Sequence, residues 1–299
     1  MSLLVVGTTA LDSIKTPYAE NPRLLGGSAS HAAIAASFFT KTHLVGAVGD
    51  DFPRKYINLY RKHGLCLEGL EQLSGQTFHW SGEYEVNMNN RRTLDTVLGV
   101  IEGYSPTLPT AYTKLPYVLL ANIAPDVQGH VLDQMRRPKF VVADTMDLWL
   151  NIAREPLLKL LKRIDCLVLN DSEASQLVEE DNIIAAMPRI HKLGPKYVIV
   201  KKGEHGSVLS SPKGFFIASA YPLKKVVDPT GAGDSFVGGL MGYLASQKGS
   251  VDKNLRAAMI HGTVTASFCC EDFGLKKTSR IKKTDITKRV RELTRMVAW

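Results

Sequence analysis

Short runs of apolar residues alternate along the chain with stretches in which apolar residues recur every three or four positions. Strands buried on both faces of a parallel sheet have such continuous apolar runs, and the longer period is typical of amphipathic helices. The pattern predicts strands at residues 3–6, 44–48, 117–120, 140–143, 166–169 and 197–200. It predicts helices at residues 28–39, 53–63, 156–162 and 172–180.

Regular alternation of strands with helices is the pattern of an α/β fold. We therefore expect a mostly parallel central sheet with helices on both faces. No internal repeat, low-complexity segment or long linker interrupts the alternation, so we expect one domain over residues 1–299.

One segment, residues 77–101, has period two instead. Tyr84, Val86 and Met88 alternate there with polar residues, the pair Asn89-Asn90 tolerates a tight turn, and a second strand follows. This predicts a small antiparallel β insertion, and residues 10–25 are a further candidate segment for it. An isolated hairpin is marginal in water, so we expect its apolar stripe to be covered by a neighbouring strand, a partner subunit or a bound ligand.

Composition excludes several protein classes. The 299 residues are 44% hydrophobic and 22% charged, which excludes disordered, collagen-like and coiled-coil proteins. No apolar run approaches the roughly 18 residues of a membrane-spanning helix, and residues 3–7 resemble a buried strand rather than a secretory signal. We expect the cysteines to be reduced and the protein to be cytoplasmic, because their spacing fits neither a disulfide framework nor a metal site. They are Cys66, Cys166, Cys269 and Cys270.

The net charge of +8 is concentrated near the C-terminus, where residues 276–299 hold nine Lys or Arg and two acidic residues. Apolar residues recur there at helical spacing after Thr284, a suitable N-cap. They are Ile286, Val290, Leu293 and Val297. We expect a surface helix docked by one apolar stripe, with a solvated basic face. A nucleic-acid surface is the alternative, but no aromatic residues interleave with the charges, so we predict no nucleic-acid partner.

A glycine loop precedes a predicted helix in residues 228–236, Asp-Pro-Thr-Gly-Ala-Gly-Asp-Ser-Phe. Helical spacing of the apolar residues that follow predicts a helix beginning near Asp234. Free N–H groups and the positive dipole end at a helix N-terminus attract anions. A carboxylate there would repel a phosphate, but Asp234 is well placed to take a proton from a hydroxyl that attacks one. The alternative is a tight glycine turn in which Asp234 only caps the helix.

This string resembles the C-terminal signature of the PfkB/ribokinase family of carbohydrate and nucleoside kinases. Four other segments resemble family motifs in the same order along nearly the whole chain, although Pro53 replaces a usual glycine. They are Gly26-Gly27-Ser28, Gly46–Phe52, Asn170-Asp-Ser-Glu173 and Lys202-Gly203-Glu-His-Gly206. The resemblance implies a ribokinase-like three-layer αβα sandwich with a small antiparallel β lid, the insertion at residues 77–101.

The resemblance also implies roles in an ATP- and Mg²⁺-dependent reaction. The resemblance makes Asp234 the catalytic base and assigns Asn170 and Glu173 to holding Mg²⁺ through water. This pair follows the strand at residues 166–169, so it lies at the edge where open α/β sheets bind ligands. The alternative for this pair is an ordinary strand end and first-turn acid. The anion hole would be Thr230, Gly231, Ala232 and Gly233. The ATP-binding residues would be Asn170, Lys202, Gly203 and Gly206, although a simple hairpin turn also explains the two glycines.

On the substrate side, the resemblance implies that Asp12 binds sugar hydroxyls, since a carboxylate can accept from two adjacent hydroxyls. A strand-end turn is its alternative role. The other implied substrate-binding residues are Gly26, Gly27, Ser28 and His31. His31 stands where many relatives have Asn, which leaves the choice of substrate open. Asp228 resembles a position that binds a monovalent cation such as K⁺ in some relatives.

We therefore predict a kinase that phosphorylates a hydroxymethyl group of a small sugar. The alternatives are a nucleoside kinase of the same family, resembling adenosine kinase, and a non-catalytic sugar or nucleotide sensor on the same fold. Arg91 and Arg92 in the insertion could reach an anionic substrate group, although solvated arginines are the simpler interpretation. A homodimer formed through the lid would cover its apolar stripe.

Overall fold

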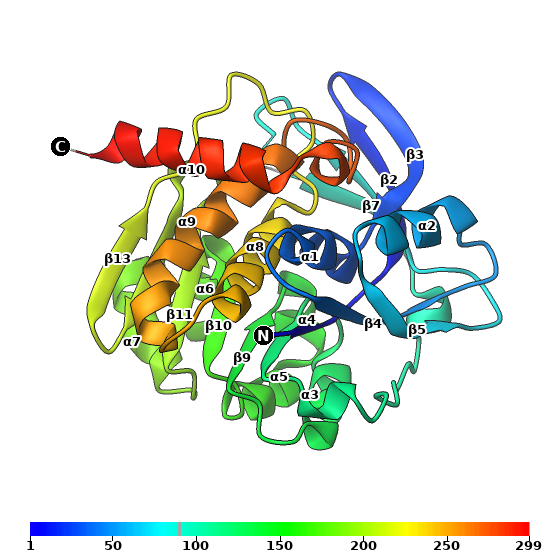
Figure 1. The fold of residues 1–299 in the computed structure, drawn as a ribbon, viewed down its shortest axis with the longest axis horizontal. Helices are drawn as coiled ribbons and strands as arrows, with labels where there is room; N and C mark the ends of the chain where they lie inside the picture. The colour runs from blue at the N-terminus through cyan, green and yellow to red at the C-terminus, as the bar shows by residue number, and fades with distance from the viewer. Residues whose placement is uncertain (89–90, 299) are drawn as a thin grey trace.

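The larger of two sheets runs through the middle of the computed structural model, which describes residues 1–88 and 91–298 (Figure 1). Its strands lie in the order β13-β12-β11-β10-β9-β8-β1-β4-β5. From β5 to β11 each strand pairs in parallel with its neighbour, whereas β12 is antiparallel to both β11 and β13. The expected mostly parallel sheet is therefore confirmed. The strands are β1 (Leu3–Val6), β4 (Thr42–Val48), β5 (Cys66–Gln72), β8 (Tyr117–Leu120), β9 (Phe140–Asp144), β10 (Cys166–Asn170), β11 (Tyr197–Lys201), β12 (Ser207–Ser211) and β13 (Gly214–Ala218).

Helices cover both faces of this sheet, as the strand–helix alternation predicted. Successive side chains of β1 point to opposite faces and join two separate hydrophobic cores. Leu3 and Val5 pack with α1 and α8 on one face, whereas Leu4 and Val6 pack with the helices on the other face. The first face carries α1 (Ser28–Ser37), α2 (Arg54–Lys62), α8 (Ala232–Ser246) and α9 (Val251–Cys269). The second carries α3 (Pro125–Gln134), α4 (Asp147–Ile152), α5 (Arg154–Leu161), α6 (Asp171–Val178) and α7 (Ile183–His191).

The smaller sheet has the order β3-β2-β6-β7 and lies beside α1 and α2 in Figure 1. It combines residues near the N-terminus with the predicted insertion. Its strands are β2 (Ala10–Thr16), β3 (Ala19–Gly26), β6 (His79–Tyr84) and β7 (Arg91–Val97). The outer pairs are antiparallel, but β2 and β6 pair in parallel. We call this sheet the lid.

The predicted apolar stripe of the lid is wrong beyond Tyr84. The strand β6 ends at this residue, and a turn follows in which the Met88 N–H donates to the Glu85 carbonyl at 2.9 Å. Tyr84 and Met88 are buried within the chain against Ile14, whereas Val86 is 79% exposed. The reversal of the chain ends the two-residue period, so these side chains no longer share one face. The predicted turn at Asn89-Asn90 lies outside the described residues.

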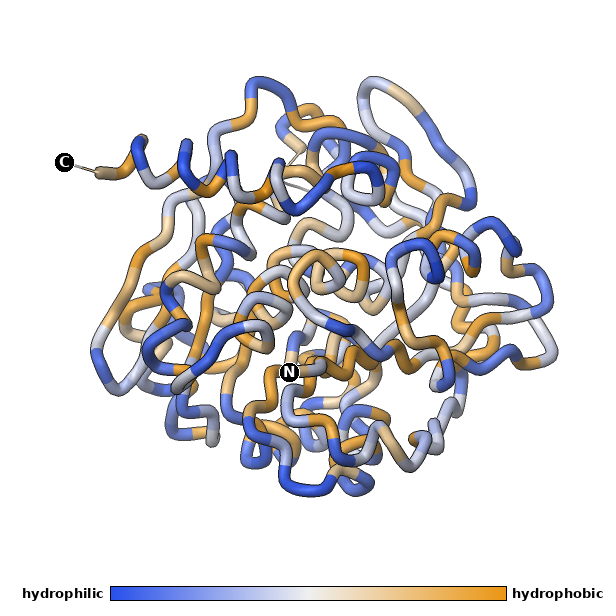
Figure 2. Tube along the Cα trace, in the orientation of Figure 1, coloured by the Kyte–Doolittle hydropathy of each residue, from blue (hydrophilic) through white to orange (hydrophobic). Residues whose placement is uncertain are grey.

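The C-terminal helix α10 (Lys283–Val297) begins earlier than predicted. Its N-cap is Lys282, whose N–H donates to the Asp285 carboxylate at 2.7 Å, so the prediction that Thr284 is the cap is wrong. Ile286 and Leu293 are buried against α9, and Figure 2 shows hydrophobic and hydrophilic residues alternating along α10. Lys283, Lys288, Arg291 and Arg295 are exposed, as predicted. The side chain of Arg289 is instead only 14% exposed, and Val297, predicted on the apolar stripe, is 48% exposed, so the stripe ends before the last turn of the helix. No helix within residues 1–88 and 91–298 is long and apolar enough to cross a membrane.

Candidate active site

The glycine loop leads into the first turn of α8. Gly231 is the N-cap, with a left-handed φ of 77°, and the helix begins at Ala232 rather than near Asp234 as predicted. Asp234 is therefore the third helical residue and is half-buried. The Ala232 N–H donates to the Pro229 carbonyl at 3.1 Å. Because first-turn amides have no acceptor within their own helix, Gly233 presents its N–H at this end.

The ring of His31 packs against the glycine loop. A Cβ on Gly231 would lie closer than 3 Å to the ring atoms Cγ, Nδ1 and Cε1. His31 is 1% exposed, and burial lowers its pKa to about 4, so the ring is neutral at physiological pH. Its Nδ1 lies 3.6 Å from the Sγ of Cys269, which in turn donates to the Thr230 carbonyl at 3.2 Å. His31 thus helps to fix the backbone of the loop.

Asp228 joins two loops beneath the site. It is fully buried, and its two carboxylate oxygens accept the N–H groups of Thr230 and Gly274, each at 2.9 Å. Burial raises its pKa, and these hydrogen bonds oppose the shift. The Thr230 hydroxyl donates to the Tyr84 hydroxyl at 3.0 Å, so a lid strand contacts the glycine loop directly.

Asp12 packs against the glycine pair that precedes α1. Its Oδ2 accepts the Gly27 N–H at 3.2 Å, and a Cβ on Gly26 would collide with the same carboxylate. Its Oδ1 is buried and has no hydrogen-bond partner within the described part of the chain. Burial raises the pKa of Asp12 to about 7, and the nearby Asp234 and Asp228 add to the shift.

Ser28 has a structural role beside this carboxylate. Its hydroxyl donates to the Asn122 carbonyl at 2.7 Å and accepts the Thr8 N–H at 3.1 Å. Its own N–H donates to the Thr8 hydroxyl at 3.0 Å. Ser28 therefore closes the turn between β3 and α1 against the end of β8.

Asn170 and Glu173 form a reciprocal cap at the start of α6. Asn170 Oδ1 accepts the Glu173 N–H, and Glu173 Oε2 accepts the Asn170 N–H, both at 2.7 Å. This is the local arrangement expected of a capping box. Glu173 is nevertheless only 6% exposed, and burial raises its pKa to about 7. The cap holds this carboxylate at the carboxyl edge of the sheet.

Lys201 and Asp144 form an ion pair between the ends of β11 and β9. Lys201 Nζ lies 3.0 Å and 3.2 Å from the two carboxylate oxygens of Asp144. Burial raises the pKa of Asp144 to about 6, although Lys201 lowers it. Burial also raises the pKa of Asp234, and the charges of Lys201 and Arg91 oppose that shift. The structure therefore brings two cations close to Asp234.

The predicted nucleotide-side turn joins β11 to β12. The Lys202 N–H donates to the Gly206 carbonyl at 2.8 Å, and both Gly203 (φ 53°) and Gly206 (φ 88°) have left-handed backbones. A Cβ on Gly206 would collide with the Ala218 carbonyl, whereas nothing lies within 4 Å of one on Gly203. Gly206 is thus required by packing, and Gly203 faces open space.

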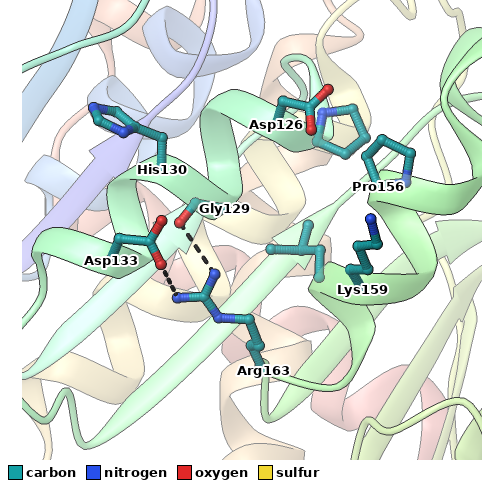
Figure 3. Close-up of a pocket in the computed structure, with 9 residues that line it drawn as sticks. Asp126, Gly129, His130, Asp133, Pro156, Lys159 and Arg163 are labelled. Carbon is teal, nitrogen blue, oxygen red and sulfur yellow. Dashed lines mark hydrogen bonds and ion pairs between the residues drawn. The ribbon is translucent and has the colours of Figure 1, made fainter.

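Two cavities lie away from these residues. One, of about 230 Å³, lies between α3 and α5, where Arg163 donates to Asp133 at 2.7 Å and to the Gly129 carbonyl at 3.3 Å (Figure 3). The other, of about 540 Å³, lies between α10 and the loop before it and is lined by Phe268 and Arg289. Neither is lined by a predicted site residue.

Sequence reasoning missed three groups in this region: Lys201, Asp144 and the Tyr84 hydroxyl. The signal for the first two was present, because each ends a predicted apolar strand one residue beyond the assigned boundary. Residues at the carboxyl ends of parallel strands converge on one edge. The contact between Tyr84 and Thr230 joins residues far apart in the chain and left no local signal.

Comparisons with known proteins identify relatives of this chain. The profile described as pfkB family carbohydrate kinase matches residues 20–282. A cytidine kinase from Thermococcus kodakarensis is 28% identical over 250 residues, which cover 81% of this chain and 88% of the relative. A 2-dehydro-3-deoxygluconokinase from Haemophilus influenzae is 32% identical over 281 residues, which cover 81% and 86%.

A solved structure has the same fold. Arabidopsis thaliana ribokinase, complexed with ribose and ATP, superposes with a TM-score of 0.74 at 22% identity. The match covers 97% of this chain and 98% of that one. The ribokinase-like fold expected from the motifs is therefore confirmed.

Proposed function

The chain belongs to the pfkB family of carbohydrate kinases, and we propose that it transfers the γ-phosphoryl group of ATP to a hydroxymethyl oxygen of a small sugar. One observation carries this proposal. A half-buried carboxylate, Asp234, lies in the first turn of α8, directly after the left-handed Gly231. Asp234 would take the proton of the acceptor hydroxyl, while the amides of Gly231 and Gly233 hold the transferred group. The Ala232 N–H already donates to the Pro229 carbonyl, so we do not count it among these donors.

The experiment is a turnover assay with Mg-ATP on ribose, 2-dehydro-3-deoxygluconate, cytidine and adenosine. Loss of a general base costs about 10²- to 10⁴-fold in rate, so Asp234→Asn should lower kcat by that factor. Asp126 is a matched control, because it is also an acid in the first turn of a helix but is exposed on α3. Asp126→Asn should retain wild-type kcat. If Asp234→Asn also retained it, Asp234 would not be the base.

A nucleoside is the alternative acceptor, favoured by the likeness to cytidine kinase. The same panel decides between the two, because turnover of cytidine or adenosine above that of the free sugars would select the nucleoside. A sensor on the same fold would bind a panel member tightly without transferring phosphate.

On the substrate side, we propose that Asp12 accepts hydrogen bonds from substrate hydroxyls. Its unpartnered Oδ1 supports this role, because a buried oxygen without a donor is costly unless a ligand supplies one. Gly26 leaves space for its carboxylate, and Gly27 donates its N–H to Oδ2. Ser28 and His31 fix the start of α1 beside it.

On the nucleotide side, we propose that the turn of Lys202, Gly203 and Gly206 contacts ATP. The open space at Gly203, next to the carboxyl end of β11, supports this placement. The Arabidopsis ribokinase of the same fold was solved with ATP. Thr230 and Asn170 flank the phosphates in this arrangement.

The residues present fit Mg²⁺ held through water. Glu173 and Asp144 are buried carboxylates with raised pKa values, and a nearby cation would favour their charged forms. Within residues 1–88 and 91–298, no three His, Cys, Asp or Glu side chains are placed to hold a metal together. An ion that keeps several waters does not need such a set. We propose that Glu173 and Asn170 orient those waters, and that the ion neutralises triphosphate charge.

We also propose a monovalent-cation site at Asp228. Each of its carboxylate oxygens accepts only one backbone N–H in the described chain, which leaves further lone pairs. Rates measured in K⁺, Na⁺ and Tris test this, and equal rates in all three would refute it.

Finally, we propose a cytoplasmic homodimer without nucleic-acid or membrane partners. The four cysteines are free thiols, which suits a reducing compartment.

Tyr84 and Met88 are covered within the chain, but the lid still exposes Val86, Leu94 and Leu98. A partner lid would cover these side chains. Light scattering after size exclusion should give twice the chain mass of 32.9 kDa, and a monomer would refute the dimer.

A further inference from the structure

Lys201 lies among three carboxylates at the edge of the large sheet. It ends β11, its register partner on β10 is Asn170, and the neighbouring β9 ends with Asp144. Its side chain is only 18% exposed. Three adjacent parallel strands therefore fix the position of this ammonium group, which no motif had suggested.

The Lys201 side chain also lies against the start of α8. Its Nζ is 3.1 Å from the point that a Cβ on Gly233 would occupy, and its Cε and Cδ are 3.7 Å and 3.8 Å away. A side chain at residue 233 would therefore force the ammonium group to shift. The glycine thus leaves room for Lys201 beside the helix amides that form the proposed anion hole.

The charges explain why a cation is needed there. Asp144, Glu173 and Asp234 are all close enough to raise the pKa of Lys201, although burial acts in the opposite direction. The net shift is upward, so Lys201 is charged at neutral pH. A phosphate that approached the helix amides would be repelled by these carboxylates. The helix N-terminus supplies only about half a positive charge, whereas Lys201 supplies a full one at the same place.

We propose that Lys201 is a catalytic residue whose Nζ binds an oxygen of the transferred γ-phosphoryl group, beside the amide of Gly233. This inference rests on the proposed kinase function. In the transfer, the acceptor oxygen bonds to the γ-phosphorus, and the bond to the β,γ-bridging oxygen breaks with its electron pair on ADP. The acceptor proton goes to Asp234. Lys201 stays protonated and offsets the charge on the phosphoryl oxygens.

Calorimetric binding of two nucleotides tests the role of Lys201. The probes are the Mg²⁺ complexes of β,γ-imido-ATP and ADP, because only the first carries a γ-phosphate. Lys201→Met should weaken the triphosphate analogue roughly 10- to 100-fold, the loss of one hydrogen bond to a charged group, and leave ADP binding nearly unchanged. Lys201→Arg should retain the preference for the triphosphate. Lys213→Met is the matched control, because Lys213 is exposed in the turn between β12 and β13.

A double variant separates this role from a structural one. Lys201→Met leaves Asp144 buried without its cation, which can itself destabilise the fold. Lys201→Met combined with Asp144→Asn removes both charges and should still lack the preference for the triphosphate. If the double variant regained wild-type preference, Lys201 would only neutralise Asp144, and the proposal would be overturned. A wild-type protein that bound neither nucleotide would overturn the kinase function itself, and this result needs no variant.

Discussion

Replacing Gly231 with alanine tests whether the glycine loop is fixed by its backbone and by His31 together. The φ of 77° is left-handed, and an L-residue with a side chain pays roughly 1–2 kcal/mol there. The new Cβ would also lie closer than 3 Å to three atoms of the His31 ring. This ring is 1% exposed and cannot move into solvent. Overpacking of this kind costs about 1–3 kcal/mol.

The two costs together predict that Gly231→Ala lowers the free energy of unfolding by roughly 2–5 kcal/mol. Gly64 is the matched control, because its φ of 69° is also left-handed and nothing lies within 4 Å of a Cβ there. Gly64→Ala should therefore cost only the backbone part, roughly 1–2 kcal/mol. Urea unfolding of both variants gives the comparison.

The contribution of His31 is isolated by a second substitution. His31→Ala creates space beside the loop. Gly231→Ala should therefore lower the free energy of unfolding by less in the His31→Ala variant than in the wild type. A coupling of about 1 kcal/mol or more is expected for residues in direct contact. Equal costs of Gly231→Ala and Gly64→Ala, or no coupling to His31, would refute the packing argument.

Three further predictions concern the lid, the substrate side and the C-terminal helix. Tyr84→Phe removes the acceptor of the Thr230 hydroxyl, so it should lower the free energy of unfolding by about 1 kcal/mol and raise KM for Mg-ATP. Adding Thr230→Val to this variant should have little further effect, because the same hydrogen bond is already lost. Burial raises the pKa of Asp12 from 3.8 to about 7. Between these pH values the folded chain keeps a proton that the unfolded chain releases, so the stability contributed by Asp12 decreases as the pH rises from about 4 to about 7. In Asp12→Asn, Tm should therefore fall less over this rise in pH than it does in the wild type. Arg289→Ala removes an ion pair to Glu271 and a cation 3.5 Å from the Phe268 ring centroid, and it should lower Tm measurably.

Six strands of the large sheet could be predicted because they are buried on both faces. The strands β5 and β13 are partly exposed, so they have no continuous buried apolar run and were not predicted. A strand such as β10 is apolar from Cys166 to Leu169, so its sequence alone distinguishes it from the helices around it. The lid strands gave a weaker signal, because β7 is exposed along most of its length and β3 carries Glu20, Asn21 and Arg23. Their order, with β2 beside β6 in parallel, depends on pairing between distant segments.

Helix starts were the least predictable boundaries. The first turn of α8 holds Ala232, Gly233 and Asp234, whose small or polar side chains give no apolar periodicity, so the helix seemed to begin later than it does. At α10 the cap is provided by a backbone N–H of Lys282 bonded to Asp285, and the side chain at the cap position carries no signal. The spacing of apolar residues identifies only the part of a helix that packs against the core, so it does not show where the helix begins.

The contacts that hold the glycine loop join motifs that are distant in the sequence. His31 follows the glycine pair before α1, and Gly231 precedes α8, yet the ring of one requires the absence of a side chain on the other. Asp228 connects the same loop to Gly274, and Thr230 connects it to Tyr84 of the lid. A substitution in any of these segments therefore acts on the amides beside Asp234. Because the His31 ring packs directly on Gly231, we expect a change at His31 to shift the backbone of the glycine loop.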